Sequence, residues 1–574
     1  MKTITTLLFF AVLFISCNSA HNSSTQVNEV ADGYVKAYFT MYPEQALTSG
    51  APDLFPDRLS DNSLTALEAW DAKVDSLLGE LNSIDATTLT GRDVITYGFV
   101  KNRLEASVNT RVCNMNLWNV SPTYNGWQNA LSFVFASLPV ETQQEKDNAN
   151  SRLSQLSRYI HTEIDNLKEG VSQGYVAPKS GVEAVIGQMN ALLQTEPEST
   201  PFAAMASGAD EAFKQKILDL ITDDINPAIE AYRDYLRDEY IAVAREVVGV
   251  SANPNGNACY QASTEDYISA SFTADEIHQS GLNQLEIIFE QMREIGERSL
   301  GTDDPAEILR IVKEEKEYRF TSRQHVIESA EGAVGRAEAA LTDWFGFVPE
   351  MESEVIPYPP YQEKTAPLGQ AIPPAADGSQ PGKYVINTYE PEKQTTSMLE
   401  PLSFHEAYPG HLFQIYVSLG TDTHPVTGYF FISGFGEGWA LYSERLAEEM
   451  GLYSSDVDRI GWLASEAHRA ARLVVDSGMH ALGWTRQQSI DFLEANTTLT
   501  STLATAETDR YIAVPGQATS YMMGALEIMR LRKEAEQALG ERFDIKEFHD
   551  LLLEDGTVPL VMMREKVERW VEGS

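Results

Sequence analysis

The chain has few cysteines, little positive charge and no long apolar run. Lys and Arg number 43 against 84 Asp and Glu, and the formal charge of −41 argues against nucleic acid or an anionic membrane surface as a partner. The apolar run from Leu7 to Ile15 is too short to cross a bilayer. Besides Cys17 there are only Cys113 and Cys259, which either pair or stay free, and nothing indicates a catalytic thiol.

Other absences bear on domain organisation and chemistry. No Pro-, Gly- or Ser-rich linker divides the mature chain, and we find no internal repeat, phosphate-cradling glycine loop or nucleophile elbow. Apolar residues recur at steps of three and four from about Val27 to Phe345, and Thr273 with Glu276 forms a capping box. These patterns predict one large domain over residues 26–574, mainly α.

The N-terminus has the form of a targeting segment. Residues 1–16 carry a lone Lys2 and an apolar run, as a signal peptide does. Phe14 to Cys17 is similar to the lipobox of bacterial lipoproteins, so we predict a lipidated Cys17 and a polar tether over residues 17–25. The alternative is a plain secretory signal. Asn18 is not the aspartate that retains lipoproteins at the inner membrane, which favours the outer membrane, facing the periplasm.

The heptapeptide from His405 to His411 is the outline of a metal site. Zinc favours a tetrahedral set of His and carboxylate ligands, and a catalytic zinc keeps one position for water. Glu406 directly follows the first histidine. A carboxylate in that position takes the proton of the water in the H-E-x-x-H peptidase motif.

The spacing departs from that motif. His405 and His411 are six positions apart, and in a regular helix they would point about 120° away from each other. Pro409 and Gly410 lie between them and permit a break, so that the extra residues can bulge out and the imidazoles converge. The alternative is that Pro-Gly only ends a helix and the histidines are ordinary polar residues near a turn.

Glu437 is the candidate for a third ligand. It begins a helix that we expect to run antiparallel to the first, within a metal-site region over residues 403–450. Glu444 is seven positions later on the same face and either orients a ligand histidine or is a solvated surface carboxylate.

A small β element precedes the metal segment, in the proline-rich region over residues 351–393. Tyr384 to Tyr389 is the clearest strand of the chain. We predict that an edge strand here pairs with a substrate backbone and that Tyr389 contacts substrate. The alternative is an ordinary surface hairpin.

A polar row lies on the apolar helix predicted over Ser454 to Leu482. Arg472, Asp476 and His480 recur at steps of four. They form either a buried ion-pair lattice or the wall of a cleft. In the second case, Arg472 holds a substrate carboxylate and His480 donates to a reacting carbonyl.

Three motifs together resemble a known family. The run from His405 to His411, Gly436-Glu-Gly-Trp-Ala440 and Pro515-Gly-Gln-Ala-Thr-Ser-Tyr521 are similar to the bacterial domain-of-unknown-function 885 family, many of whose members are predicted lipoproteins. The resemblance runs over most of the mature chain. It implies a large helical, zincin-like metallopeptidase fold, distantly similar to angiotensin-converting enzyme and the oligopeptidases. Those relatives mostly carry the four-residue histidine spacing.

The resemblance also implies an oxyanion donor. Related peptidase folds place a tyrosine hydroxyl of a C-terminal helix against the oxyanion, which indicates Tyr521 first and Tyr511 second. We predict that Gln517, in the same run, contacts substrate.

The resulting hypothesis is a zinc metallopeptidase with one Zn²⁺ per chain and short peptides as substrates. His405, His411 and Glu437 hold the zinc, Glu406 is the general base and Tyr521 stabilises the oxyanion. Two alternatives stay open: a non-catalytic lipid-anchored peptide-binding protein, and a zinc hydrolase of another amide or ester.

Overall fold

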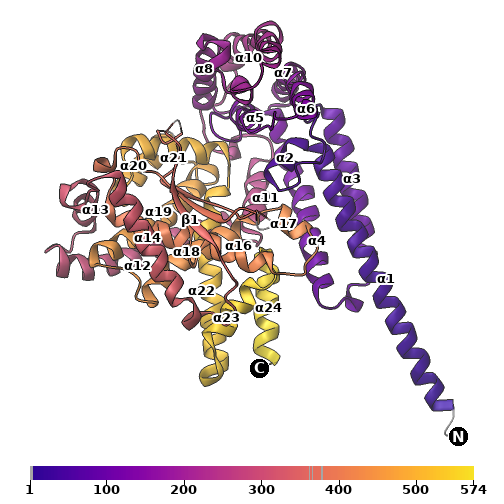
Figure 1. Ribbon diagram of the computed structural model, residues 1–574, viewed down its shortest axis with the longest axis vertical. Coiled ribbons are helices and arrows are strands. Elements are labelled where there is room, and N and C mark those ends of the chain that lie inside the picture. The colour runs from indigo at the N-terminus through magenta and orange to yellow at the C-terminus, as the bar shows by residue number, and fades with distance from the viewer. Residues whose placement is uncertain (1–3, 361, 365, 376–378, 574) are drawn as a thin grey trace.

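The structure is a computed structural model that describes residues 4–360, 362–364, 366–375 and 379–573, with side chains from residue 23 onward (Figure 1). The predicted signal peptide begins at residues 1–3, outside the described residues. The side chains of the rest of that segment, and of Cys17, lie outside them too.

The helices form an N-terminal arm, an upper lobe and a body (Figure 1). The arm packs through apolar side chains of its first helix, among them Val27, Ala31 and Tyr34, into the same hydrophobic core as the body. Its helices are α1 (Ile4–Met41), α2 (Pro43–Thr48), α3 (Leu64–Asn82) and α4 (Arg92–Thr110).

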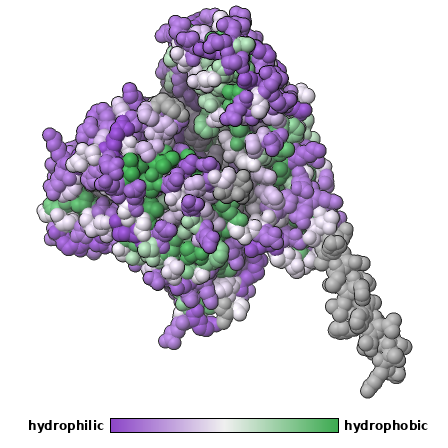
Figure 2. Space-filling view, viewed as in Figure 1, coloured by the Kyte–Doolittle hydropathy of each residue, from purple (hydrophilic) through white to green (hydrophobic). Residues whose placement is uncertain are grey.

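The upper lobe has a separate core, in which Phe135, Ile160, Val185 and Tyr232 are buried. Its helices are α5 (Trp127–Ala136), α6 (Gln143–Leu153), α7 (Leu156–Gln173), α8 (Lys179–Gln194), α9 (Glu211–Leu220) and α10 (Asn226–Asp238). The surface is hollowed between the lobe and the body (Figure 2).

The body contains the remaining helices. They are α11 (Gly256–Ile268), α12 (Ala274–Ser299), α13 (Pro305–Glu314), α14 (Arg323–Trp344), α15 (Leu399–Glu406), α16 (His411–Leu419), α17 (Val426–Tyr429), α18 (Ser433–Glu449), α19 (Asp456–His480), α20 (Arg486–Asn496), α21 (Ser501–Ala513), α22 (Ser520–Leu539), α23 (Ile545–Leu553) and α24 (Leu560–Gly573). The predicted capping box is confirmed, because the side chains of Thr273 and Glu276 each accept from the other's backbone N–H at the start of α12.

Short turns of 3₁₀ or π helix connect many of these elements. They are η1 (Ala86–Thr88), η2 (Arg111–Cys113), η3 (Met115–Leu117), η4 (Pro197–Ser199), η5 (Pro201–Ala206), η6 (Ile221–Ile225), η7 (Tyr240–Ala242), η8 (Val250–Ala252), η9 (Lys316–Tyr318), η10 (Pro391–Lys393), η11 (Thr396–Met398), η12 (Gln517–Thr519) and η13 (Gly540–Arg542).

One small sheet lies in the body, in the order β1 (Ser353–Pro357), β3 (Gly382–Ile386), β2 (Gly369–Ile372). β1 pairs in parallel with β3, and β2 pairs antiparallel with it, placing Ala371 opposite Tyr384. The predicted strand therefore exists but ends at Ile386, before Tyr389. The mainly α class with a minor β element is confirmed.

Two further features complete the fold. Cys113 and Cys259 form a disulfide between η2 and α11, which settles the question that the sequence left open. Among the residues that the structure describes, no helix combines the length and the apolar composition needed to cross a membrane.

Candidate metal centre

A four-residue break between two helices brings the histidines together. α15 ends at Glu406 and α16 begins at His411. Gly410 packs directly on α15, because a Cβ atom there would lie 1.9 Å from the carbonyl oxygen of His405. The carbonyl of Pro409 accepts hydrogen bonds from Trp439 Nε1 at 2.9 Å and Ser443 Oγ at 3.3 Å, which fixes the loop to α18.

Three side chains converge on one point. The Nε2 atoms of His405 and His411 each lie 3.5 Å from Glu437 Oε2, and one possible ligand atom from each residue lies within 4.8 Å of the other two. The imidazole centroids are 4.9 Å apart at nearly perpendicular planes. Because of the break, two histidines six positions apart converge, which a regular helix would prevent.

Glu437 reaches this point from the first turns of α18, which lies close to a neighbouring helix. A Cβ atom at Gly438 would meet the backbone of Gly524 in α22 at 2.6 Å, so a glycine is needed there for the two helices to approach. The sequence Gly436-Glu-Gly438 is therefore a packing feature as well as a carrier of the carboxylate.

Glu444 lies behind His405. Its Oε1 accepts a hydrogen bond from His405 Nδ1 at 2.9 Å, and its side chain is 1% exposed. The interpretation of Glu444 as a solvated surface carboxylate is therefore wrong. A carboxylate in this position fixes the ring orientation and leaves Nε2 directed at the convergence point.

The charges of the cluster are strongly coupled. Burial lowers the pKa of His405, but hydrogen bonds with Glu437 and Glu444 outweigh burial and raise that pKa to about 9. Burial raises the pKa of Glu437, but its hydrogen bonds with the two imidazoles hold it well below its usual range. The anionic carboxylate and the two imidazoles together provide donor atoms that a divalent cation can bind.

Glu406 is held by the sheet. Its Oε2 accepts a hydrogen bond from the backbone N–H of Ala371 at 2.9 Å. Ala371 belongs to β2, an edge strand of the sheet. Strand β2 therefore runs beside the carboxylate of Glu406.

Tyr521 lies next to the cluster, on the first turn of α22. Burial raises the pKa of its hydroxyl, and the negative charge of Glu437 raises it further. The guanidinium of Arg472 stacks on its ring at 4.5 Å from the centroid. Gln517 interacts with the Tyr521 hydroxyl and accepts a hydrogen bond from Arg510 Nη1 at 2.7 Å.

The polar row of α19 is a buried lattice. His480 Nδ1 accepts from the N–H of Val250 at 3.0 Å, and His480 Nε2 donates to the carbonyl of Tyr511 at 2.9 Å. Both ring nitrogens are engaged by backbone, so the structure does not support a contact of His480 with a reacting carbonyl. Asp476 accepts from Tyr260 Oη at 2.7 Å and from the N–H of Gly516 at 3.1 Å.

Tyr511 is part of the same lattice. Its hydroxyl accepts from Arg472 Nε at 2.9 Å and donates to Glu507 Oε2 at 2.5 Å. This engagement leaves Tyr521 as the tyrosine beside the metal cluster. Tyr389 lies in the turn after β3, where the ammonium of Lys364 is 5.9 Å from its ring centroid, and among the described residues its ring does not contact the metal cluster.

Sequence reasoning missed two exposed aromatic residues, Phe431 beside the cluster and Tyr124 in the lobe. Phe431 is 56% exposed, and its ring centroid is 6.3 Å from that of His411. Tyr124, in the lobe, is 53% exposed and accepts a hydrogen bond from Arg510 of the body. The pair Phe430-Phe431 directly before the glycine-rich start of α18 could have indicated Phe431 as a candidate. No local sequence pattern indicates Tyr124.

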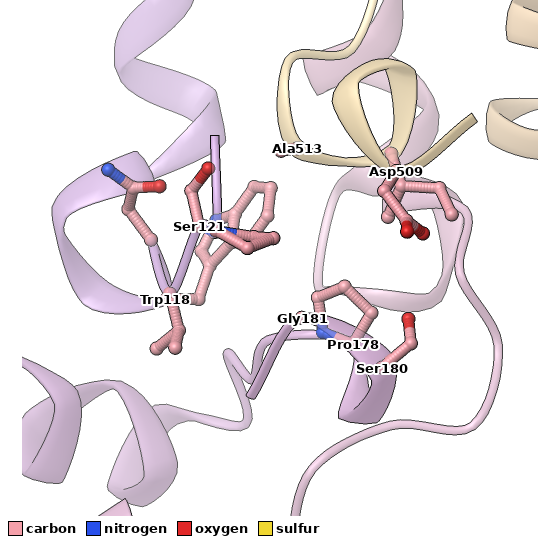
Figure 3. A pocket seen from close by; sticks show the side chains of 11 residues that line it. Trp118, Ser121, Pro178, Ser180, Gly181, Asp509 and Ala513 are labelled. Atoms are coloured by element: carbon pink, nitrogen blue, oxygen red, sulfur yellow. The ribbon is translucent and has the colours of Figure 1, made fainter. Parts of the chain in front are cut away.

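A junction between lobe and body lies elsewhere (Figure 3). Side chains near Trp118, Pro178 and Asp509 surround a cavity of about 10 Å³, which is room for one water at most. This junction is a packing contact between the lobe and α21. None of the residues that line its cavity belongs to the metal cluster.

Known proteins share this fold over nearly the whole chain. A predicted lipoprotein from Colwellia psychrerythraea is 25% identical, covers 97% of this chain and 100% of its own, and superposes with a TM-score of 0.85. A predicted lipoprotein of unknown function from Shewanella oneidensis is 18% identical over 94% of this chain and 99% of its own, with a TM-score of 0.75, and shows the fold alone. No curated protein matches the chain.

The family profile described as "Bacterial protein of unknown function (DUF885)" matches residues 43–567, a range that includes the lobe, the sheet and the metal cluster. The resemblance that the three motifs indicate is confirmed: the chain belongs to this bacterial family of unknown function.

Proposed function

We propose that the protein is a zinc-dependent peptidase that hydrolyses short peptides. The observation that carries the proposal is the convergence of two imidazole Nε2 atoms and one carboxylate oxygen, with a second carboxylate on the adjacent residue. Two histidines and a glutamate are a known ligand set of catalytic zinc.

The donor set fits zinc in type and in its supporting contacts. His405 has its Nδ1 bonded to the buried Glu444, which leaves Nε2 for a metal. His411, His405 and Glu437 would hold the ion. When bound, zinc supplies a Lewis acid that polarises a carbonyl and lowers the pKa of water.

Glu406 would serve as general base and then as general acid. Its carboxylate takes a proton from the attacking water and passes it to the leaving amine. The N–H of Ala371 already donates to Oε2, which orients the carboxyl group. The other oxygen, Oε1, is the atom that we assign to proton transfer.

Tyr521 would donate its hydroxyl to the oxyanion of the tetrahedral intermediate. Its pKa is raised by burial and by the charge of Glu437, so the hydroxyl keeps its proton at neutral pH. A hydroxyl that stays protonated can act as the donor that the developing negative charge needs.

The surroundings favour short, flexible substrates. The surface is hollowed between lobe and body, and β2 is an edge strand beside Glu406 (Figure 2). An extended peptide can add to such an edge through backbone hydrogen bonds. We expect cleavage to fall steeply for peptides longer than about a dozen residues, and folded proteins to stay intact.

The proposed location is a membrane surface reached through a lipid on Cys17. The two structural relatives are described as predicted lipoproteins, and Phe14 to Cys17 has the form of a lipobox. The outer membrane, facing the periplasm, is the compartment that Asn18 favours.

A peptide-library digest read by mass spectrometry tests the function. We expect cleavage by the zinc-loaded protein, none after chelation, and recovery when zinc is added back. Glu406→Gln should keep its zinc and lose roughly 10²- to 10⁴-fold in hydrolysis, because only the base is removed. Undiminished hydrolysis by this variant would refute the mechanism.

A further inference from the structure

An exposed aromatic ring lies beside one of the two histidines of the candidate metal centre. The ring centroid of Phe431 is 6.3 Å from that of His411, and the two ring planes are inclined at 62°. Phe431 is 56% exposed, although phenylalanine is among the residues most often buried in folded proteins. The exposed part of this ring is therefore an apolar surface next to a candidate zinc ligand.

The fold does not need the exposed part of this ring. Phe431 stands between two residues with extended backbone, Phe430 and Ile432, whose exposed fractions are 7% and 2%. Phe430 packs on Tyr38 of the arm, with ring centroids 4.7 Å apart. Because side chains alternate along an extended chain, the two buried neighbours turn Phe431 to the opposite side, which is the side of His411.

Gly436 provides the seat of the ring. A Cβ atom at this position would lie 2.3 Å from two ring carbons of Phe431, Cε2 and Cζ, so a larger residue would displace the ring. Gly436 stands directly before Glu437, the carboxylate of the metal cluster. The ring is therefore placed between the imidazole of His411 and the first turn of α18.

We propose that Phe431 binds the side chain of a large apolar residue of the substrate, so that the protein cleaves peptides with phenylalanine, leucine or a similar residue at one of the two positions flanking the scissile bond. This inference rests on the proposed peptidase function. Consecutive Cα atoms are about 3.8 Å apart, so with the reacting carbonyl at the metal cluster only the flanking residues place a side chain next to a ligand imidazole. The hydrophobic effect favours burial of the exposed part of the ring against such a side chain, and an aromatic side chain adds an edge-to-face contact.

A cationic side chain is the other occupant that such a ring can take, through a cation–π contact. The net charge of −41 attracts cationic peptides to the protein as a whole. Beside His411, however, the divalent cation that the cluster would hold repels a second positive charge. The apolar occupant is therefore favoured at this position, and a lysine peptide is the comparison that separates the two.

The experiment uses pentaglycine peptides whose central residue is replaced by phenylalanine, leucine, alanine or lysine. The zinc-loaded parent gives kcat/KM and, from product masses, the cleaved bond, and calorimetry on zinc-loaded Glu406→Gln gives affinities. Raised ionic strength screens the general attraction of the lysine peptide. We expect the phenylalanine and leucine peptides to exceed the alanine and lysine peptides by roughly 10-fold in both measurements, with cleavage at a bond of the central residue.

Substitutions assign the preference to the ring. In Phe431→Ala the phenylalanine peptide should fall to the level of the alanine peptide, while the zinc content stays at about one per chain because the ring is not a ligand. Phe431→Leu, whose side chain is apolar but smaller, should keep part of the preference and serves if Phe431→Ala does not fold. Phe347→Ala removes a ring that is 51% exposed and whose N–H donates to Asp550 of α23, and this control should keep the full preference.

Several results would overturn the inference. They are equal values for the phenylalanine and alanine peptides in the parent, a lysine peptide that exceeds the phenylalanine peptide, cleavage away from the central residue, and a preference that is unchanged in both Phe431 variants. Loss of zinc from both variants also overturns it, because the ring would then support the cluster rather than bind substrate.

The outcomes also separate this inference from the proposed function. Cleavage of all four peptides without an apolar preference overturns the inference and leaves the peptidase standing. Tighter binding of the phenylalanine peptide that depends on Phe431, with no hydrolysis by the parent, supports the contact with an apolar side chain and overturns the peptidase.

Discussion

The metal cluster, in which His405 is buried and His411 and Glu437 are half-buried, and the buried polar row of α19 both combine histidine with carboxylate, yet their bonding differs. His405 has one nitrogen on a buried carboxylate and the other directed at Glu437, 3.5 Å away. His480 has both nitrogens on backbone groups at 2.9 and 3.0 Å. His549 resembles His480, with Trp344 O and Tyr442 Oη as partners.

The difference shows how a ligand histidine can be told from a structural one. A structural imidazole satisfies backbone groups that would otherwise be orphaned, so its two contacts are short and complete. A ligand imidazole has one fixed side and one side that faces other donors at a longer distance. By this criterion His405 is a candidate ligand, and His480 and His549 belong to the fold.

The largest expected effect is the loss of metal. His405→Ala combined with His411→Ala removes two of three ligands, so zinc should fall from about one per chain to almost none, and hydrolysis should cease. Metal analysis after growth with added zinc measures it, with His161→Ala on the lobe helix α7 as the control. Full occupancy in the double variant would show that the convergence does not bind zinc.

Tyr521→Phe should reduce kcat by roughly 10²- to 10³-fold, the cost of removing one oxyanion donor. KM should change much less, because the hydroxyl acts on the transition state. The ring remains, so its stacking with Arg472 is kept. Steady-state kinetics on one peptide measures both constants. A change confined to KM would show that Tyr521 binds substrate and does not act in the chemical step.

Glu444→Gln should weaken zinc binding by roughly 10- to 100-fold. The amide keeps the size of the side chain and removes the charge that orients His405. Competition with a metal-sensitive dye measures the affinity. Glu448→Gln, one turn further along α18 in an ion pair with Arg459, is the matched control. Equal zinc affinities in the two variants would show that Glu444 does not support zinc binding through His405.

Much of the fold and the site could be predicted from the sequence because the signals are local. Residue types, a Pro-Gly break and a second carboxylate seven positions after Glu437 indicated the three side chains that converge and the position of Glu444. Apolar periodicity indicated the helices. The short strand β3 was recognised, although its end was placed three residues too late. After Ile386 the side chain of Asn387 accepts a hydrogen bond from the N–H of Tyr389 at 2.9 Å, and this turn takes the chain out of the sheet.

Long-range pairing could not be predicted in the same way. The steps of four in Arg472, Asp476 and His480 indicate a common face but not the partners, which lie 31 to 230 positions away for His480. The lobe residue Tyr124 accepts a hydrogen bond from Arg510, which lies 386 positions later in the chain. Such contacts depend on how the lobe and the body pack, which no local pattern encodes.

The smallest expected effect concerns His480 and acid stability. Burial lowers the pKa of His480 to about 4, so the ring is neutral in the folded protein, whereas in the unfolded chain it takes up a proton at its ordinary pKa near 6.5. The stability that this difference contributes is complete above pH 6.5 and is lost as the pH falls toward 4.

His480→Gln removes that titration. The fall in the free energy of unfolding between pH 6.5 and 4 should then be smaller by up to an amount on the order of 3 kcal/mol, although the variant is less stable at neutral pH. Asp476 acts in the opposite sense, because burial raises its pKa to about 7 and its contribution is lost as the pH rises, so His480→Gln isolates the histidine. Urea unfolding across this pH range measures the slope, and zinc content should stay at about one per chain. If the pH dependence of the free energy of unfolding is unchanged in the variant, His480 takes up its proton in the folded protein as readily as in the unfolded chain. If the variant loses zinc, the polar row of α19 supports the metal cluster after all.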